Sequence, residues 1–305
     1  MSAALPTDHA RRKWRAAWLS VALTASAVAA KGAVAAITGS SAVLAETAHS
    51  LSDLLAALIA LVAVRAADRP PDPRHPFGHQ KLEHVSAVVE GLLLVVVAAF
   101  VAIRAAQSFG EPVEHSGLGI AVMLVFAGLS FVVARRVSRV ARESHSAALE
   151  ADSAHISADV WSSLGTAAAL IVVALSGWAE ADAIVAIGIS AWIAATGGRL
   201  ALNGMRVLVD ESVSQDDLDA IRDALDEARP DGVLSYHRLR ARRSGAMRHV
   251  DVHVVVDPEM TVRDSHAIAD RIETAVEERL PSADVVVHIE PAGAKPETDS
   301  RVEGG

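Results

Sequence analysis

Two histidine–aspartate pairs with the same spacing are the most informative feature of this sequence. His49 and Asp53 stand four residues apart in an apolar stretch, and His155 and Asp159 repeat that spacing further along the chain. Each pair lies in the same sequence motif, an acidic residue followed by x–Ala–His–x–x–x–Asp. A spacing of four residues places both side chains on one face of a helix. Two such helices offer two imidazoles and two carboxylates, which can build the closed tetrahedral site that Zn2+ favours.

The surroundings of these four residues indicate where such a site would lie. Ionisable groups inside a membrane span cost about 2.5–3.5 kcal/mol each on insertion scales and are rare without a function. We therefore predict a binding site for a divalent metal within a membrane. The alternative is a pair of interhelical hydrogen bonds that only holds a bundle together. Glu46 and Asp152, each three residues before its histidine, are interpreted as solvated helix ends.

The composition is that of a membrane protein rich in small residues. Of the residues, 51% are hydrophobic and only 4% are aromatic, and the mean hydropathy is positive. Six apolar segments are each near the ~20 residues that a helix needs to cross the hydrocarbon core. They are Trp14–Ile37, Val43–Val64, Val85–Ala106, Leu118–Ala134, Ala154–Leu175 and Ala183–Met205.

The distribution of basic residues predicts the direction of these spans. Arginines and lysines precede the first span and lie in the connections between the second and third and between the fourth and fifth. The intervening connections, Gly39–Ala42, Gly110–Gly117 and Gly177–Asp182, contain neither. By the positive-inside rule, both termini are cytoplasmic. A competing interpretation is a cleaved signal peptide ending near Ala27-Val28-Ala29, but the apolar run is longer than usual and five further spans follow.

The chain after Asp210 has a different character. Lysine plus arginine balances aspartate plus glutamate through Asp210, so the whole net charge of −9 lies beyond it. The pattern there predicts a soluble domain in the order αββαβ: a helix from an N-cap at Ser214 to about Ala228, strands at Val233–Arg243 and Arg248–Val256, a helix at Thr261–Leu280 and a strand at Asp284–Ile289. No HExxH, GxSxG or P-loop motif is present, and we expect no enzymatic activity.

Further residues of metal-ligand type lie outside the spans. Asp72, His75 and His79 fall within eight positions of a proline-containing loop, which is either a metal site or a polar connector. On period-2 alternation, His253 shares a strand face with His249 and Asp251, while His288 and Glu290 share a face of another strand. Cysteine is absent, so any metal must be held by histidine, carboxylate or backbone oxygen.

These features together resemble the cation diffusion facilitator family of proton-coupled zinc transporters. The resemblance covers about Trp14 to Pro291 and rests on the duplicated pairs, on Phe77-Gly-His-Gln-Lys-Leu-Glu83 and on the αββαβ tail. It implies a six-helix transmembrane domain with a metallochaperone-like cytoplasmic domain, working as a homodimer that exchanges metal for protons. It also implies a transport site at His49, Asp53, His155 and Asp159, and a second zinc site at Asp72, His75 and His79.

The resemblance also implies roles for residues of the αββαβ domain. It implies a zinc pair held by His237, His253, His266, His288 and Glu290, where some relatives carry aspartate in place of Glu290. Lys81 matches a residue that pairs with an acidic group after the sixth span, here Asp210, and such a pair would tie the two domains together.

The resulting expectation is a zinc exporter of the cell (inner) membrane, embedded in lipid and without a nucleic-acid partner. We expect residues 1–13 to be a cytoplasmic tail, 14–206 the membrane domain, 207–292 the cytoplasmic metal-binding and dimerisation domain, and 293–305 a disordered tail. The rival functions are transport of Fe2+, Co2+ or Mn2+ by the same fold, and a membrane metal sensor that does not transport. Ligand type argues against Mn2+, which prefers oxygen donors, but does not separate zinc from iron or cobalt.

Overall fold

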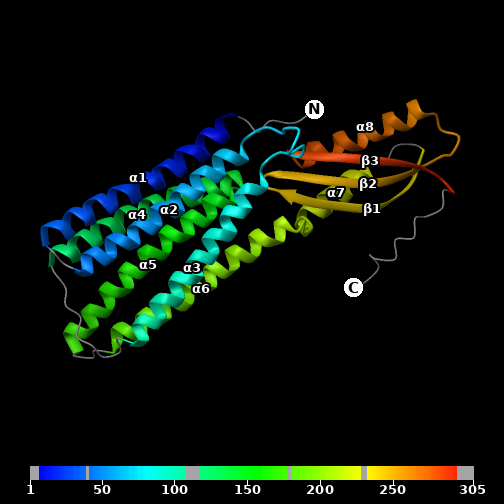
Figure 1. Ribbon diagram of the computed structural model, residues 1–305. Coiled ribbons are helices and arrows are strands. Elements are labelled where there is room, and N and C mark those ends of the chain that lie inside the picture. Colours follow the sequence, from blue (N-terminus) through cyan, green and yellow to red (C-terminus); the bar gives the residue numbers. More distant parts are fainter. Residues whose placement is uncertain (1–6, 39–40, 108–116, 177–179, 228–231, 294–305) are drawn as a thin grey trace. The chain divides into compact units, whose positions relative to one another are not determined.

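The computed structural model describes residues 7–38, 41–107, 117–176, 180–227 and 232–293 (Figure 1). The chain divides into two compact units, Ala4–Val209 and Asp210 to the C-terminus. Within the described residues, the first unit is made of six long helices and the second of a three-stranded sheet with two helices. The fold class expected from the sequence is therefore confirmed.

Each predicted span lies inside one helix of the first unit. The helices are α1 (Thr7–Thr38), α2 (Ser41–Ala67), α3 (Lys81–Gln107), α4 (Gly117–Ser144), α5 (Ala147–Ser176) and α6 (Ala181–Leu208). They run beyond the apolar segments because polar flanks continue the same backbone hydrogen bonding. In α4 the helix continues ten residues past Ala134 through an arginine-rich stretch. The predicted arginine-free and lysine-free connections and the C-terminal tail lie largely outside the described residues.

Three segments of the described chain are long and apolar enough to cross a membrane by length and composition alone. They are Ala10–Val34 in α1, Lys81–Gln107 in α3 and Ala183–Leu208 in α6. Large apolar side chains on these helices, such as Phe100 and Leu202, are 64% and 60% exposed. An outward-facing apolar surface of this kind is expected where lipid replaces water.

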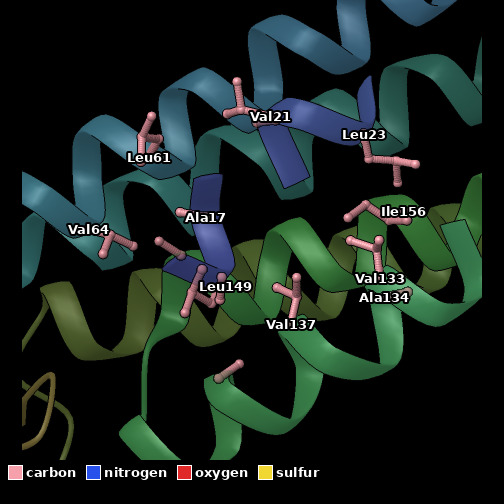
Figure 2. Close-up of a cluster of buried hydrophobic side chains, with 14 of the residues drawn as sticks. Ala17, Val21, Leu23, Leu61, Val64, Val133, Ala134, Val137, Leu149 and Ile156 are labelled. Carbon is pink, nitrogen blue, oxygen red and sulfur yellow. The ribbon is translucent and has the colours of Figure 1, made fainter. Parts of the chain in front are cut away.

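The core of the helical unit is built mainly from alanine and valine. Figure 2 shows the cluster in which Ala17 and Val21 of α1 pack with Val64 of α2, Val137 of α4 and Leu149 of α5. Ala17, Val64, Val137 and Leu149 have no exposed surface. Small side chains let the four helices approach one another closely, which is how helices associate where burial from water contributes little.

The second unit has the predicted order α7 (Gln215–Glu227), β1 (Val233–Ser244), β2 (Met247–Val256), α8 (Val262–Arg279) and β3 (Ala283–Pro291). Strands β1 and β2 are antiparallel, and β2 and β3 are parallel because α8 carries the chain across between them. The predicted N-cap is present, since the Asp217 backbone N–H donates to Ser214 Oγ at 3.2 Å. The hairpin turn is Gly245–Ala246, with Gly245 at φ 60°.

Alternation along β2 separates the two faces of this sheet. Val250, Val252, Val254 and Val256 are buried and pack with α7 and α8. The intervening residues, His253 among them, lie on the opposite face. The helices therefore cover one face and leave a polar face rich in histidine.

Helices α3 and α6 approach closely at two glycines. A Cβ added to Gly91 would lie 2.6 Å from Gly197 O, and one added to Gly197 would lie 2.6 Å from Gly91 O. Gly204 is similarly tight against Val88 and His84, whereas Gly188 and Gly198 of α6 have room for a Cβ. Two of the four glycines of α6, Gly197 and Gly204, are therefore sites of close helix packing.

We expect Gly91→Ala to destabilise the helical unit and Gly128→Ala not to. Gly128 lies in α4 with nothing within 4 Å of an added Cβ, so alanine there only improves helix propensity. At Gly91 two backbones must separate, at a cost of about 1–3 kcal/mol. Thermal unfolding of both variants in detergent measures the difference. Equal stabilities would contradict the close α3–α6 packing.

Candidate metal centres

The structure brings together three of the four ligands predicted in the helical unit. One ligand atom from each of Asp53, His155 and Asp159 lies within 4.8 Å of the others. His155 Nε2 donates to Asp53 Oδ1 at 3.1 Å, and both residues are 7% exposed. The carboxylate of α2 therefore meets the imidazole of α5. A metal would replace the proton on Nε2, because imidazole binds metals in its neutral form.

The fourth predicted ligand is placed only by its backbone. His49 lies in α2, one turn before Asp53 and on the same face. Its side chain and that of Glu46 lie outside the described residues. The position of His49 is compatible with the proposed tetrahedron, and its role stays a prediction.

Asp152 differs from the sequence-based interpretation. It was expected at a solvated helix end, but it is only 2% exposed, and Ser20 Oγ of α1 donates to its Oδ1 at 2.8 Å. The error arises because α5 begins at Ala147, so Asp152 already lies more than one turn inside the helix, where α1 packs against it.

A second group of ligand type forms in the loop between α2 and α3. Ligand atoms of Asp72, His75 and His79 lie within 4.8 Å of one another. Asp72 Oδ1 accepts from the His75 backbone N–H at 2.8 Å, and Oδ2 lies 3.3 Å from His79 Nε2. That backbone hydrogen bond, followed by those from Arg74 and the His75 ring, holds the pKa of Asp72 below its usual value. An ionised carboxylate between two imidazoles is an exposed site suited to a divalent metal.

A third group lies on the polar face of the sheet. Ligand atoms of His237, His253 and Glu290 lie within 4.8 Å of one another. The pairing register explains this, since His237 is opposite His253 in β1–β2 and His253 is opposite His288 in β2–β3. The residues predicted on separate strand faces therefore share one face of the sheet, which only the register could establish.

Glu290 is the centre of this group. Its Oε1 accepts from His253 Nδ1 at 2.6 Å, and its Oε2 lies 3.4 Å from His237 Nε2. His288 Nε2 lies 3.6 Å from Oε1. The His253 hydrogen bond, reinforced by the neighbouring imidazoles, lowers the pKa of Glu290. A lowered carboxyl pKa contributes stability above the unfolded-state value, and this contribution is lost as the pH falls through the lowered value.

His266 is not brought into this group. It lies on α8, exposed, with Nε2 3.7 Å from Asp270 Oδ1 one turn further on. Among the described residues, none of the three groups that could hold a metal includes His266. Its predicted role as a ligand stays a prediction.

Lys81 lies in the helical unit and Asp210 in the unit that follows it. Lys81 Nζ donates to Leu208 O at 3.5 Å, and Arg242 donates to Asp210 Oδ1 at 2.9 Å. The predicted pair between them stays a prediction.

The sequence analysis missed a buried carboxylate in the middle of a span. Glu90 lies in α3 with no exposed surface, and Ser86 Oγ donates to its Oε1 at 2.9 Å. A glutamate in the middle of an apolar span was the signal that could have identified it.

Comparison with known proteins assigns the family. Residues 17–209 match the cation efflux transmembrane domain, and residues 213–292 match the cation efflux protein cytoplasmic domain. The chain is 32% identical over 275 residues to the uncharacterized transporter sll1263 of Synechocystis sp., covering 90% of this chain and 88% of that protein. It is 33% identical over 263 residues to the cation-efflux pump FieF of Yersinia pestis, covering 85% and 86%.

Two solved structures are similar to the domain that follows Asp210. The metal-bound C-terminal domain of the CzcD transporter from Thermotoga maritima is 30% identical, with a TM-score of 0.25, covering 27% of this chain and 99% of that one. CzrB in a zinc form is 29% identical, with a TM-score of 0.27, covering 28% and 97%.

The matched domains define a membrane protein that transports cations outward, with a transmembrane domain followed by a cytoplasmic domain. The chain belongs to the cation diffusion facilitator family of cation-efflux transporters.

We expect His253→Ala to weaken zinc binding by the isolated segment 211–292 by at least about tenfold. Removing a residue that only orients a metal ligand already lowers metal affinity by about that factor, and removing the ligand itself should lower it more. The segment has a hydrophobic core of its own. His249→Ala is the matched control, since it lies on the same strand face but contacts Asp284 at 3.1 Å. Calorimetry of both variants measures the affinities. Equal affinities would remove the sheet site.

Proposed function

We propose that this transporter exports Zn2+ from the cytosol in exchange for protons, through a site formed by His49, Asp53, His155 and Asp159. The observation that carries the proposal is the buried contact between His155 and Asp53, with Asp159 beside it. Two imidazoles and two carboxylates would satisfy the tetrahedral preference of Zn2+, and two carboxylates balance its charge. Fe2+ and Co2+ accept the same ligands, so competition among metals decides the cargo.

Proton exchange follows from the chemistry of the same ligands. The His155 Nε2 that donates to Asp53 must lose its proton before it can bind a metal. Imidazole titrates near pH 6.5, so protonation and metal binding compete within the physiological range. A site that opens alternately to the two sides would then return with protons after releasing zinc.

The remaining assignments extend this proposal. The loop group and the sheet group would hold further zinc ions, and their exposed residues would let them exchange with cytosolic metal. The transporter would act as a homodimer in the cell membrane, with both termini cytoplasmic. A contact between Lys81 and Asp210 would tie the membrane domain to the cytoplasmic domain, at the boundary expected near residue 207.

We expect Asp53→Asn to abolish zinc transport while the protein stays folded. The variant removes one ligand and one negative charge from a desolvated ion. Glu143→Gln is the control. Glu143 is exposed at the end of α4, and its ion pair with Arg12, at 3.9 Å, is exposed as well. Zinc uptake into proteoliposomes, with Fe2+, Co2+ and Mn2+ as competitors, measures both activity and preference. Transport at the parental rate by Asp53→Asn would show that the site is wrongly assigned.

We also expect zinc flux to follow an imposed pH gradient. Zinc binding should weaken as the pH falls below about 6.5, since protonated imidazole does not bind metal. A pH-sensitive dye inside the vesicles should report protons moving opposite to zinc. His155→Asp should retain four ligands but shift this dependence, because a carboxylate titrates near pH 4. Zinc flux that does not change with the pH gradient would contradict proton exchange and indicate a carrier that works by facilitated diffusion.

A further inference from the structure

Besides Glu83, which pairs with Lys13, two buried carboxylates of the described helical unit are not used by the metal centres. Glu90 of α3 is 0% exposed and Asp152 of α5 is 2% exposed. One oxygen of each accepts a serine hydroxyl: Ser86 donates to Glu90 Oε1 at 2.9 Å, and Ser20 donates to Asp152 Oδ1 at 2.8 Å. The other oxygens, Glu90 Oε2 and Asp152 Oδ2, have no hydrogen-bond partner among the described residues.

The two carboxylates are neighbours of each other and of the transport site. Helices α3 and α5 pack together, and Glu90 lies within charge–charge range of both Asp152 and His155. Asp152 is likewise within range of His155, which follows it by three residues on the same helix face. The pair therefore responds to whatever charge occupies the His155–Asp53 contact.

A cluster of buried apolar side chains occupies the same segments of α3 and α5 as the pair. Ala87 and Leu94 flank Glu90 on α3, Ala151 and Ala158 come from α5, and Ile193 comes from α6. Such surroundings give a low local dielectric, in which an unpaired charge is costly.

The described cations nearby do not balance two negative charges. Lys13 of α1 is buried but pairs with Asp68 and Glu83, the latter at 3.0 Å. Lys31, further along α1, donates to Ser50 Oγ of α2 at 2.8 Å. Arg199 and Arg206 of α6 are exposed, as are the arginines of α4, which are Arg135, Arg136, Arg139 and Arg142. On α2 the facing ionisable group is Asp53, itself bonded to His155, and on α3 Glu83 and His84 lie nearer the start of the helix.

Two carboxylates in such a setting cannot both ionise without a cation. We propose that Glu90 and Asp152 hold one proton between them while the transport site is empty, and release it when a divalent metal binds at Asp53 and His155. The O–H bond of the protonated carboxyl breaks, and the proton passes to water. The two positive charges of the metal then stabilise the doubly ionised pair. When the metal leaves, the pair takes up a proton again.

This inference rests on the proposed exchange of zinc for protons and adds to it a proton carrier distinct from the ligands. Histidine protons are displaced by direct competition for the same atom. The Glu90–Asp152 pair responds through space, so that its proton can be removed by mutation without removing a metal ligand.

The test counts protons released per zinc bound by the full-length protein in detergent at neutral pH. Metal-free protein in a weak buffer is titrated with Zn2+, and proton release is read with a pH indicator. Glu90→Gln and Asp152→Asn should each reduce the release by about one proton per transport-site zinc, because either amide removes the acid pair. Glu150→Gln is the matched control, since Glu150 is exposed on α5 two residues from Asp152. Glu90→Asp keeps a carboxylate and should restore the release.

The outcomes separate this inference from the function on which it rests. If the parent protein releases protons and the Glu90→Gln and Asp152→Asn variants release the same number, the carboxylate pair is not a proton carrier. If the parent releases none and its flux ignores the pH gradient, proton exchange itself is wrong. Should Glu90→Gln fail to fold, Asp152→Asn gives the same decision. In vesicles, the supporting result is retained zinc binding with a weakened response to the pH gradient.

Discussion

Charge buried inside an apolar bundle must find a partner, and this constraint fixes how the helices of the membrane domain pack. The contact between His155 and Asp53 joins α5 to α2, and the hydroxyl of Ser20 joins α1 to Asp152 on α5. Lys13 joins α1 to Asp68 and Glu83, at the end of α2 and the start of α3. Alanine, valine and leucine interfaces could slide by a turn at little cost, whereas breaking one of these pairs would leave a buried charge unsatisfied, typically at 3–5 kcal/mol. The polar contacts therefore set the register in which the ligands meet.

Small residues make these polar contacts possible. In lipid, burial of apolar surface does little to bring helices together, so close van der Waals packing must do so. Gly91 and Gly197 bring the α3 and α6 backbones together, and alanines fill much of the interface that surrounds Glu90. The burial of Glu90 follows from this geometry. Glu90 directly precedes Gly91 and lies where α3 packs against α5. A bulkier interface would leave room for water around the carboxylate, and the electrostatic coupling to His155 would weaken.

Patterns with a strict period were predicted well from the sequence. Most partners distant in sequence were not, and the contact between Asp53 and His155 is the exception, because the repeated spacing indicated it. The four-residue spacing of His155 and Asp159, the six helices and the αββαβ order each follow from local periodicity. Lys13 was counted among the basic residues flanking a span, yet it is buried in an ion-pair triad with two acidic residues more than fifty positions away. Asp152 was placed at a solvated end because α1, which covers it, is not visible in the local pattern. The common face of His253 and Glu290 required the strand register, which hydrophobic alternation alone does not specify.

Differences in burial would give the three candidate metal centres different physical roles. Asp72 and His75 are exposed, so an ion bound there would keep part of its hydration and would exchange directly with solvent. Glu290 is intermediate, held by imidazoles on an open sheet face. Asp53 and His155 are buried, so an ion can reach them only if the helices move and it loses its water. The loss of hydration is offset by the ligands and by any change in nearby charge. A carboxylate pair that changes its charge as the ion arrives would lower the net charge change in the membrane, and this would be the physical advantage of the proposed coupling of zinc to protons.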